Sequence, residues 1–414
     1  MKKLILGWIS AAGFLAGVLT ETGWGVPRTD LLSIYKKGEI RIVSDPEFGK
    51  ETDCSAQTSL ADRYRAGRII LRADEDWTSN LPADLVFESR GDIAVAPDGS
   101  VFVSNTTRHI IFKFDRDGKF IKAFGRPGQG PGDLTNPGRL SILDGKYLVV
   151  GESPTNRRLS LFDLDGTFVK IISTGRYAGR PIALGRGKIA YIYIGGRMEQ
   201  AEMINLEDVV IIDGATGAQK TVIRHEFKHP LVKIGPRGST MIWTGTIIMD
   251  ATRDGGLVVG TTRDARLDLF SADGLKVGTI DTGWKALPVT SEYRARLKSF
   301  YQRQAEEQGR KPSTADPVLP DRLEILQNVW TDSEGNILVC KKTECLEGCP
   351  LVFRAYSPKG DFLSDFEIAP GPFVLSADWR FRRIALTDRG LFGLLEFIND
   401  PDGFLHLVRT AFQP

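Results

Sequence analysis

The feature of this sequence that most constrains its fold is a unit of four short apolar runs, separated by turns, that recurs along the chain. In the clearest copy, residues 92–105 read Asp-Ile-Ala-Val-Ala-Pro-Asp-Gly-Ser-Val-Phe-Val-Ser-Asn, and two further runs follow at 110–114 and 120–124. An Asp-Gly pair separates the first run from the second, and another separates the third from the fourth. Asp-Gly supplies the positive φ angles that tight hairpin turns require. The unit therefore predicts a four-stranded antiparallel meander.

The same paired glycine punctuation occurs four more times, at Gly145 and Gly166, Gly187 and Gly214, Gly255 and Gly274, and Gly335 and Gly360. A sixth set has only three runs, at 383–386, 391–397 and 404–408. Its missing outer strand would come from the N-terminal segment, either from 39–43 or from 68–71. Joining the two ends in this way closes a ring and removes an exposed sheet edge. We therefore expect an all-β, six-bladed β-propeller over residues 85–412, closed by a strand from residues 26–84.

The repeat also carries a family resemblance. Residues 92–105, with 110–114 and 120–124, resemble the NHL repeat, and the following Gly-Arg-Pro-Gly-Gln-Gly-Pro-Gly-Asp-Leu at 125–134 resembles the glycine-rich inter-blade loop of bacterial six-bladed propellers. The resemblance covers residues 85–412 at the level of architecture.

One segment, residues 285–323, departs from the repeat and is expected to be an insertion between the fourth and fifth blades. Tyr293, Leu297, Phe300 and Tyr301 stand among charged residues at a spacing that predicts a helix with an apolar stripe. Long inserted loops often cap a site. The alternative is a helix packed on the side of the ring.

The N-terminus resembles an export signal. Met1-Lys2-Lys3 is followed by a run without charge from Leu4 to Val18, which is too short to predict a membrane span and has the length of a signal core. Residues 1–25 are therefore expected to be a signal peptide or an N-terminal anchor. The protein is expected to be exported, periplasmic or extracellular, with membrane contact only through an uncleaved N-terminus.

The four cysteines fit an oxidising compartment. Cys345 and Cys349 are close enough in sequence to close a small loop, and Cys54 and Cys340 form the second candidate disulfide. The alternative is a zinc site made by Cys340, Cys345 and Cys349, for which no fourth ligand lies nearby in the sequence.

Candidate binding residues follow from propeller geometry. The loops between the second and third strands of each blade, and those between successive blades, lie on one face, which we call the loop face. Its basic candidates are Arg108, His109, Arg126, Arg157, Arg158, Arg197, Arg263 and Arg266. Such a cluster would attract an anionic partner. The competing interpretation is an ordinary solvated surface, because Glu152, Glu199, Asp264 and Glu344 lie in the same loops.

Candidate catalytic residues come mainly from the resemblance. Related propellers that hydrolyse lactones hold a divalent cation in the channel, and Asp92, Asp250 and Asn328 occupy similar places here. A calcium ion prefers six or more oxygen ligands, so three residues are weak support. Related lyases bind zinc through several histidines, but His225 and His229 are expected at a strand and its exit, pointing in unrelated directions. No nucleophile elbow or Walker loop is present.

These observations favour an exported, non-catalytic scaffold that binds a protein, peptide or glycan on the loop face, without a cofactor. The alternative is a metal-dependent hydrolase or lyase acting in the central channel, with calcium as the cation. Nucleic acid is not expected as a partner. The net charge is only +2, and RNA binding, known among cytosolic NHL proteins, conflicts with the export signal.

Overall fold

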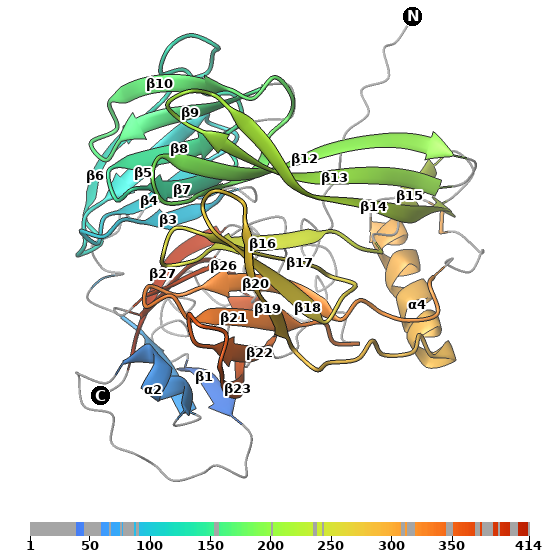
Figure 1. The fold of residues 1–414 in the computed structure, drawn as a ribbon. Coiled ribbons are helices and arrows are strands. Elements are labelled where there is room, and N and C mark those ends of the chain that lie inside the picture. Colours follow the sequence, from blue (N-terminus) through green and yellow to red (C-terminus); the bar gives the residue numbers. More distant parts are fainter. Residues whose placement is uncertain are drawn as a thin grey trace, which may run out of the picture.

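The computed structural model describes residues 39–44, 59–65, 68–74, 77, 87, 91–152, 157–199, 202–234, 238–241, 244–307, 311–312, 319–344, 351–368, 373–374, 384–387, 390–397 and 405–412. Their strands form five sheets arranged around a common centre, and the fold is an all-β propeller with few helices (Figure 1). The expected signal segment, residues 1–25, lies outside the described residues.

The first two sheets are four-stranded meanders, as the repeat predicts. The first contains β3 (Ile93–Val95), β4 (Val101–Asn105), β5 (Ile110–Phe114) and β6 (Phe120–Phe124), and the second contains β7 (Arg139–Leu143), β8 (Tyr147–Gly151), β9 (Arg158–Asp163) and β10 (Phe168–Ser173). Gly118 turns β5 into β6 with a φ of +85°. A Cβ atom there would lie 2.5 Å from the carbonyl oxygen of Trp77, so both the turn and the packing require glycine at this position.

The third sheet has longer strands than its repeat predicts, and it has a fifth strand. It contains β11 (Gly179–Ala183), β12 (Lys188–Glu199), β13 (Glu202–Asp213), β14 (Gln219–Ile234) and β15 (Gly238–Met241). The distal halves of β12, β13 and β14 extend beyond the ring as a three-stranded arm (Figure 1). The fourth sheet is again a simple meander of β16 (Ile247–Ala251), β17 (Leu257–Thr261), β18 (Arg266–Phe270) and β19 (Lys276–Asp281).

The expectation of six blades is wrong, because the remaining strands form one ten-stranded sheet and bring the total to five. It runs through β20 (Leu326–Thr331), β21 (Ile337–Lys341), β22 (Leu351–Tyr356), β23 (Phe362–Ile368), β1 (Glu39–Ser44), β2 (Arg68–Ala73), β27 (Leu405–Phe412), β26 (Gly390–Phe397) and β24 (Phe373–Val374), with β25 (Ile384–Thr387) also paired to β26. The physical reason is the hairpin of β1 and β2. Strand β1 pairs with β23 and strand β2 pairs with β27, so the two sets of strands that the sequence separates are hydrogen-bonded into one sheet.

Among the described residues, five apolar clusters hold the ring together, and each one joins two neighbouring parts of it. The clusters contain residues of the first and second sheets, the second and third, the third and fourth, and the fourth and fifth. The last packs Phe112 and Phe114 of the first sheet against Phe392 of β26 and Leu407 of β27. Burial of apolar side chains between consecutive sheets is thus the main stabilising contact around the whole circle.

Two helices accompany the sheets in the described part of the chain. Helix α2 (Leu60–Arg65) stacks Tyr64 on Phe366 of β23, and helix α4 (Ser291–Glu307) lies between β19 and β20 in the chain and buries Tyr293 and Leu297. No helix among the described residues is both long and apolar enough to cross a membrane.

Candidate binding face

Contacts between neighbouring loops define one end of the propeller. Nδ1 of His109, which lies between β4 and β5, accepts a hydrogen bond from the backbone N–H of Asn136 in the connection to the second sheet (2.9 Å). Likewise, the carbonyl of Thr262, after β17, accepts hydrogen bonds from Ile325 and Leu326 at the start of β20. The loops within blades therefore meet the connections between blades at the same end.

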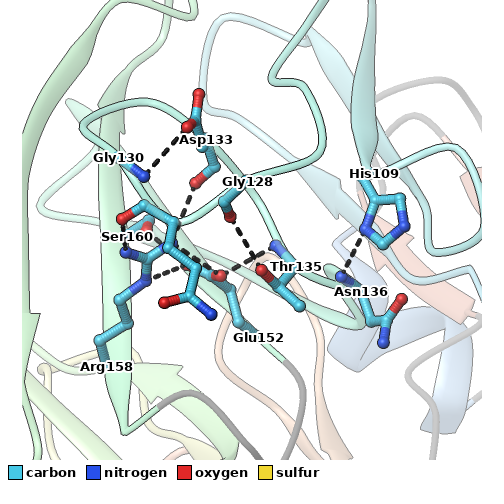
Figure 2. Close-up of polar contacts among 10 residues, drawn as sticks. His109, Gly128, Gly130, Asp133, Thr135, Asn136, Glu152, Arg158 and Ser160 are labelled. Carbon is cyan, nitrogen blue, oxygen red and sulfur yellow. Dashed lines mark hydrogen bonds and ion pairs between the residues drawn. The ribbon is translucent and has the colours of Figure 1, made fainter.

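The glycine-rich loop at residues 125–134 is a rigid turn. Asp133 accepts a hydrogen bond from Nε of Arg126 (2.6 Å). It accepts another from the backbone N–H of Gly130 (3.0 Å) (Figure 2). The hydrogen bond from Arg126, and then the one from Gly130, lower the pKa of the Asp133 carboxyl. A Cβ atom on Gly128, whose φ is +155°, would lie within 2.3 Å of that carboxylate. The glycines therefore allow the loop to close tightly on Asp133.

A buried carboxylate, Glu152, connects this loop to the second sheet. It accepts hydrogen bonds from Nε and Nη2 of Arg158 (3.0 and 3.2 Å), from the hydroxyl of Ser160 (2.6 Å) and from the backbone N–H of Thr135 (2.9 Å) (Figure 2). Arg158 also donates to the carbonyls of Gln129 and Asp133. Arg158 was predicted as a binding residue, and the structure places it inside this network with a side chain that is only 13% exposed.

The other predicted basic residues fall into two groups. Three make ion pairs: Arg126 with Asp133, Arg197 with Glu199 and Glu226, and Arg266 with Asp281. Three are exposed and have no ion pair within the described residues, namely Arg108, Arg157 and Arg263. Arg197 also lies on the arm, near the end of β12, rather than in a loop over the ring.

The three residues of the metal hypothesis line a single cavity at the centre of the ring. Asp92, Asp250 and Asn328 surround it together with Arg139 and Arg180, and each of the five sheets contributes one of these residues at its inner strand. Roughly 40 Å³ of the cavity is open to water, which is room for a few molecules at ~10–15 Å³ each. The three residues therefore line the same cavity, although they lie far apart in the sequence.

Their oxygen atoms, however, bond to the main chain. Oδ2 of Asp92 accepts a hydrogen bond from the backbone N–H of Leu140 in the next blade (3.0 Å), and Oδ2 of Asp250 accepts one from Thr331 (2.8 Å). Oδ1 of Asn328 accepts the backbone N–H of Val329 (2.9 Å). Within the described residues, no group of three or more His, Cys, Asp or Glu side chains is arranged to hold a metal ion. The two aspartates link neighbouring blades, and this role fits them better than coordination of a cation beside two guanidinium groups.

The prediction for the two histidines of the third blade is wrong. Strand β14 runs without a break through His225, Phe227 and His229, and side chains two apart on a strand share a face. The rings of His225 and His229 both lie against Phe227, with centroids 5.9 and 6.3 Å away. His229 is fully buried, and burial, followed by the charge of Arg263, lowers its pKa to about 4. The sequence had suggested that the strand ended between the two residues.

The predicted disulfide from Cys340 to Cys54 is not present, because Cys340 is a buried free thiol. It lies on β21, where its neighbours across the sheet are Asn328 and Phe353. Cys54, Cys345 and Cys349 lie outside the described residues, as do the bridge between Cys345 and Cys349 and the zinc alternative. Strand β21 lies between β20 and β22 in the ten-stranded sheet, so Cys340 is enclosed within that sheet.

Burial raises the pKa of the Cys340 thiol well above its ordinary value. We therefore expect Cys340 to resist alkylation by iodoacetamide in the folded protein and to react once urea unfolds it. Peptide mass spectrometry after alkylation at pH 8 checks this, with the unfolded sample as the control. Rapid labelling of Cys340 in the folded protein would contradict its burial.

Sequence reasoning missed the buried acidic residues of the loop face. Glu207 accepts hydrogen bonds from Thr246 and from the backbone N–H of Ile247, and Asp208 accepts two from Arg224. Burial raises the pKa of Glu324. The sequence did contain a signal for Glu207 and Asp208, because this Glu-Asp pair interrupts the apolar run of β13. Charged side chains are rarely buried unless they are paired, so the pair predicted basic or hydrogen-bonding partners nearby.

Neither a protein-family model nor a curated protein matches this chain. Solved structures resemble it weakly. A member of the DUF4221 family from Bacteroides vulgatus has a TM-score of 0.46 at 12% identity, covering 83% of this chain and 98% of that one. A protein from Bacteroides fragilis described as exported has a TM-score of 0.40 at 10% identity, covering 82% and 98%. Regucalcin, a calcium-binding protein from Agrobacterium tumefaciens, has a TM-score of 0.36 at 13% identity, covering 80% and 94%. It is the arrangement of the chain's own sheets and of the apolar clusters between them that makes it a β-propeller.

Proposed function

We propose that this protein is an exported, non-catalytic binding scaffold that recognises an acidic protein, peptide or glycan on its loop face. The observation that carries the proposal is the set of three exposed guanidinium groups, on Arg108, Arg157 and Arg263, that have no ion pair within the described residues. Guanidinium groups bind carboxylate and phosphate oxygens through two parallel hydrogen bonds. Arg126, Arg158 and Arg266 already have acidic partners, so among the described residues the three unpaired arginines are the better candidates.

The residues that follow Arg108 and Arg157 in the chain, His109 and Arg158, bond to the glycine-rich connection between the first two blades. His109 bonds to Asn136, and Arg158 bonds to Gln129 and Glu152, so the loop between the two blades is fixed on both sides (Figure 2). A surface that is already ordered loses less conformational entropy when it binds. This rigidity supports a recognition role.

The alternative, cation-assisted hydrolysis in the central channel, has weaker support. Asp92, Asp250 and Asn328 do line one cavity, but each uses an oxygen to accept a main-chain hydrogen bond. Elemental analysis of the purified protein tests this alternative, and stoichiometric calcium would favour it over the scaffold.

Export is part of the proposal, and it depends on residues 1–25. Lys2 and Lys3 precede an uncharged run, the arrangement that signal peptides share. We also propose the NHL-type repeat as the origin of the blades and a Cys345–Cys349 disulfide in the exported protein. Fractionation of cells that produce the full chain tests the location, and a cytosolic product would contradict it.

The binding proposal is tested by reversing the three free charges. The variant Arg108→Glu, Arg157→Glu and Arg263→Glu should lose at least ~10-fold in affinity for partners recovered from the envelope fraction, since like charges then face each other. Its matched control reverses three exposed basic residues in hairpin turns at the opposite end, Arg116, Arg186 and Lys359. Both variants carry the same net charge. Equal loss in both, or no loss in the first, would rule out the loop face.

A further inference from the structure

The arm of the third blade has an open strand edge. Strand β11 pairs with β12 only up to Ile192, opposite Gly179, whereas β13 pairs with β12 as far as Glu199. Residues 193–199 therefore have a partner on one side, and within the described part of the chain no strand pairs with their other side. Figure 1 shows β12 as the outermost strand of the arm.

The register identifies which backbone groups point outward from this edge. The carbonyl of Lys188 accepts a hydrogen bond from Leu184, at the end of β11, so the backbone groups of Lys188 point to the β11 side. Backbone direction alternates along a strand, and the pairing of β12 with β13 has no bulge. The N–H and C=O groups of Ile194, Gly196 and Met198 therefore point outward.

Within residues 193–199 this edge has no lysine, no proline and no bulge against β13. Exposed edges are commonly blocked by lysine, proline or a bulge. The outer strands of the first, second and fourth blades carry Lys122, Lys170 and Lys276. The open edge instead reads Tyr-Ile-Gly-Gly-Arg-Met-Glu, and the side chain of Met198 is 54% exposed.

We propose that two copies of this chain associate through residues 193–199 of β12, as antiparallel strands related by a two-fold axis at Gly196. The inference is independent of the proposed function. In this register, Gly196 faces Gly196 of the second copy, and Ile194 faces Met198 of the second copy. The outward backbone groups of Ile194, Gly196 and Met198 then all form hydrogen-bonded pairs with the second copy. An antiparallel ladder requires such pairing at every second residue.

The side chains also fit this register. Ile194 and Met198 form an apolar pair across the axis on one face of the sheet. On the other face, Arg197 stands opposite Gly195 of the second copy, so the two arginines do not oppose each other. Arg197 is already neutralised by Glu199 and Glu226 within its own arm. The two arms become one six-stranded sheet, and the small contact predicts a reversible dimer.

Sedimentation velocity across ~1 to ~100 μM tests the proposal, a range that spans the affinities of weak, reversible interfaces. The wild-type protein should shift from monomer to dimer as its concentration rises. Met198→Lys should weaken the dimer about tenfold or more, since a charge then replaces half of the apolar pair. The matched control, Val277→Lys, alters a 67% exposed residue on the outer strand β19 and should leave the dimer unchanged. A wild-type protein that stays monomeric, or a dimer that Met198→Lys does not weaken, would overturn the inference.

A cysteine at the axis gives a second, geometric test. Opposed residues of a hydrogen-bonded pair have Cα atoms about 5.5 Å apart, within the range that a disulfide spans. Gly196→Cys should therefore form a covalent dimer on mild oxidation, visible on a non-reducing gel. Met198→Cys is the control, because it faces Ile194 of the second copy and not itself. Cross-linking of Met198→Cys as fast as Gly196→Cys would contradict the register.

Discussion

Replacing Glu152 with alanine is expected to destabilise the folded protein by about 3–5 kcal/mol, because it leaves a nearly buried guanidinium without its carboxylate. Arg158, the partner, is 13% exposed and donates two hydrogen bonds to Glu152. The substitution also removes the acceptors of Ser160 and of the Thr135 backbone. Urea unfolding of the wild type and the variant, followed by circular dichroism, measures the difference.

The control for this prediction is Arg126→Ala in the same loop. Arg126 pairs with Asp133, but its side chain is 78% exposed, so water replaces the lost partner. Its unfolding midpoint should stay near that of the wild type. If Glu152→Ala unfolds at the wild-type midpoint as well, the buried pair does not hold the loop.

The same substitution connects stability to binding. The backbone of Thr135 anchors one end of the glycine-rich loop to Glu152 (Figure 2). Loss of that anchor would loosen the surface between Arg108 and Arg157. We therefore expect Glu152→Ala to weaken partner binding even at temperatures where the protein remains folded.

The strands of each blade could be predicted because the turns that separate them are local. Asp-Gly at 98–99 and 117–118 requires positive φ angles, and Gly99 and Gly118 have them. The apolar runs between these turns became β3 to β6 with nearly the expected bounds. The number of sheets could not be predicted in this way, because it depends on the strands with which β1 and β2 pair. Those partners, β23 and β27, are more than 300 residues away in the sequence.

The arm and the buried charges were missed for a related reason. After Ile194 the apolar run of β12 gives way to Gly-Gly-Arg, so the sequence shows no alternating pattern there. The strand continues because β13 supplies its hydrogen bonds as far as Glu199. Glu152 comes directly after β8, where the sequence predicts an ordinary exposed loop residue. Its burial is explained by its pairing with Arg158, which the sequence does not show.

Acidification is expected to destabilise the protein through His229. Its pKa is about 4 in the folded state and 6.5 when unperturbed, so the unfolded chain binds a proton more readily between these values. The contribution of this residue to stability is complete above pH 6.5 and is lost as the pH falls through 4. The difference amounts to about 3 kcal/mol at 1.36 kcal/mol per unit.

The geometry around His229 explains the shift. Nδ1 accepts a hydrogen bond from the backbone N–H of Thr244 (3.1 Å), so a proton added to the neutral ring would displace that donor. The ring is fully buried against Phe227, and the positive charge of Arg263 further opposes protonation. Below pH 5 the contact between β14 of the arm and the loop before β16 should therefore weaken first.

The substitution His229→Gln isolates this effect. Glutamine can accept the Thr244 hydrogen bond but does not titrate, so its stability relative to the wild type should rise by about 3 kcal/mol between pH 7 and pH 4. Urea unfolding at intervals of one pH unit measures the difference, and the carboxylates that titrate in both proteins cancel. Parallel stability curves for the wild type and His229→Gln would show that the proton binds elsewhere.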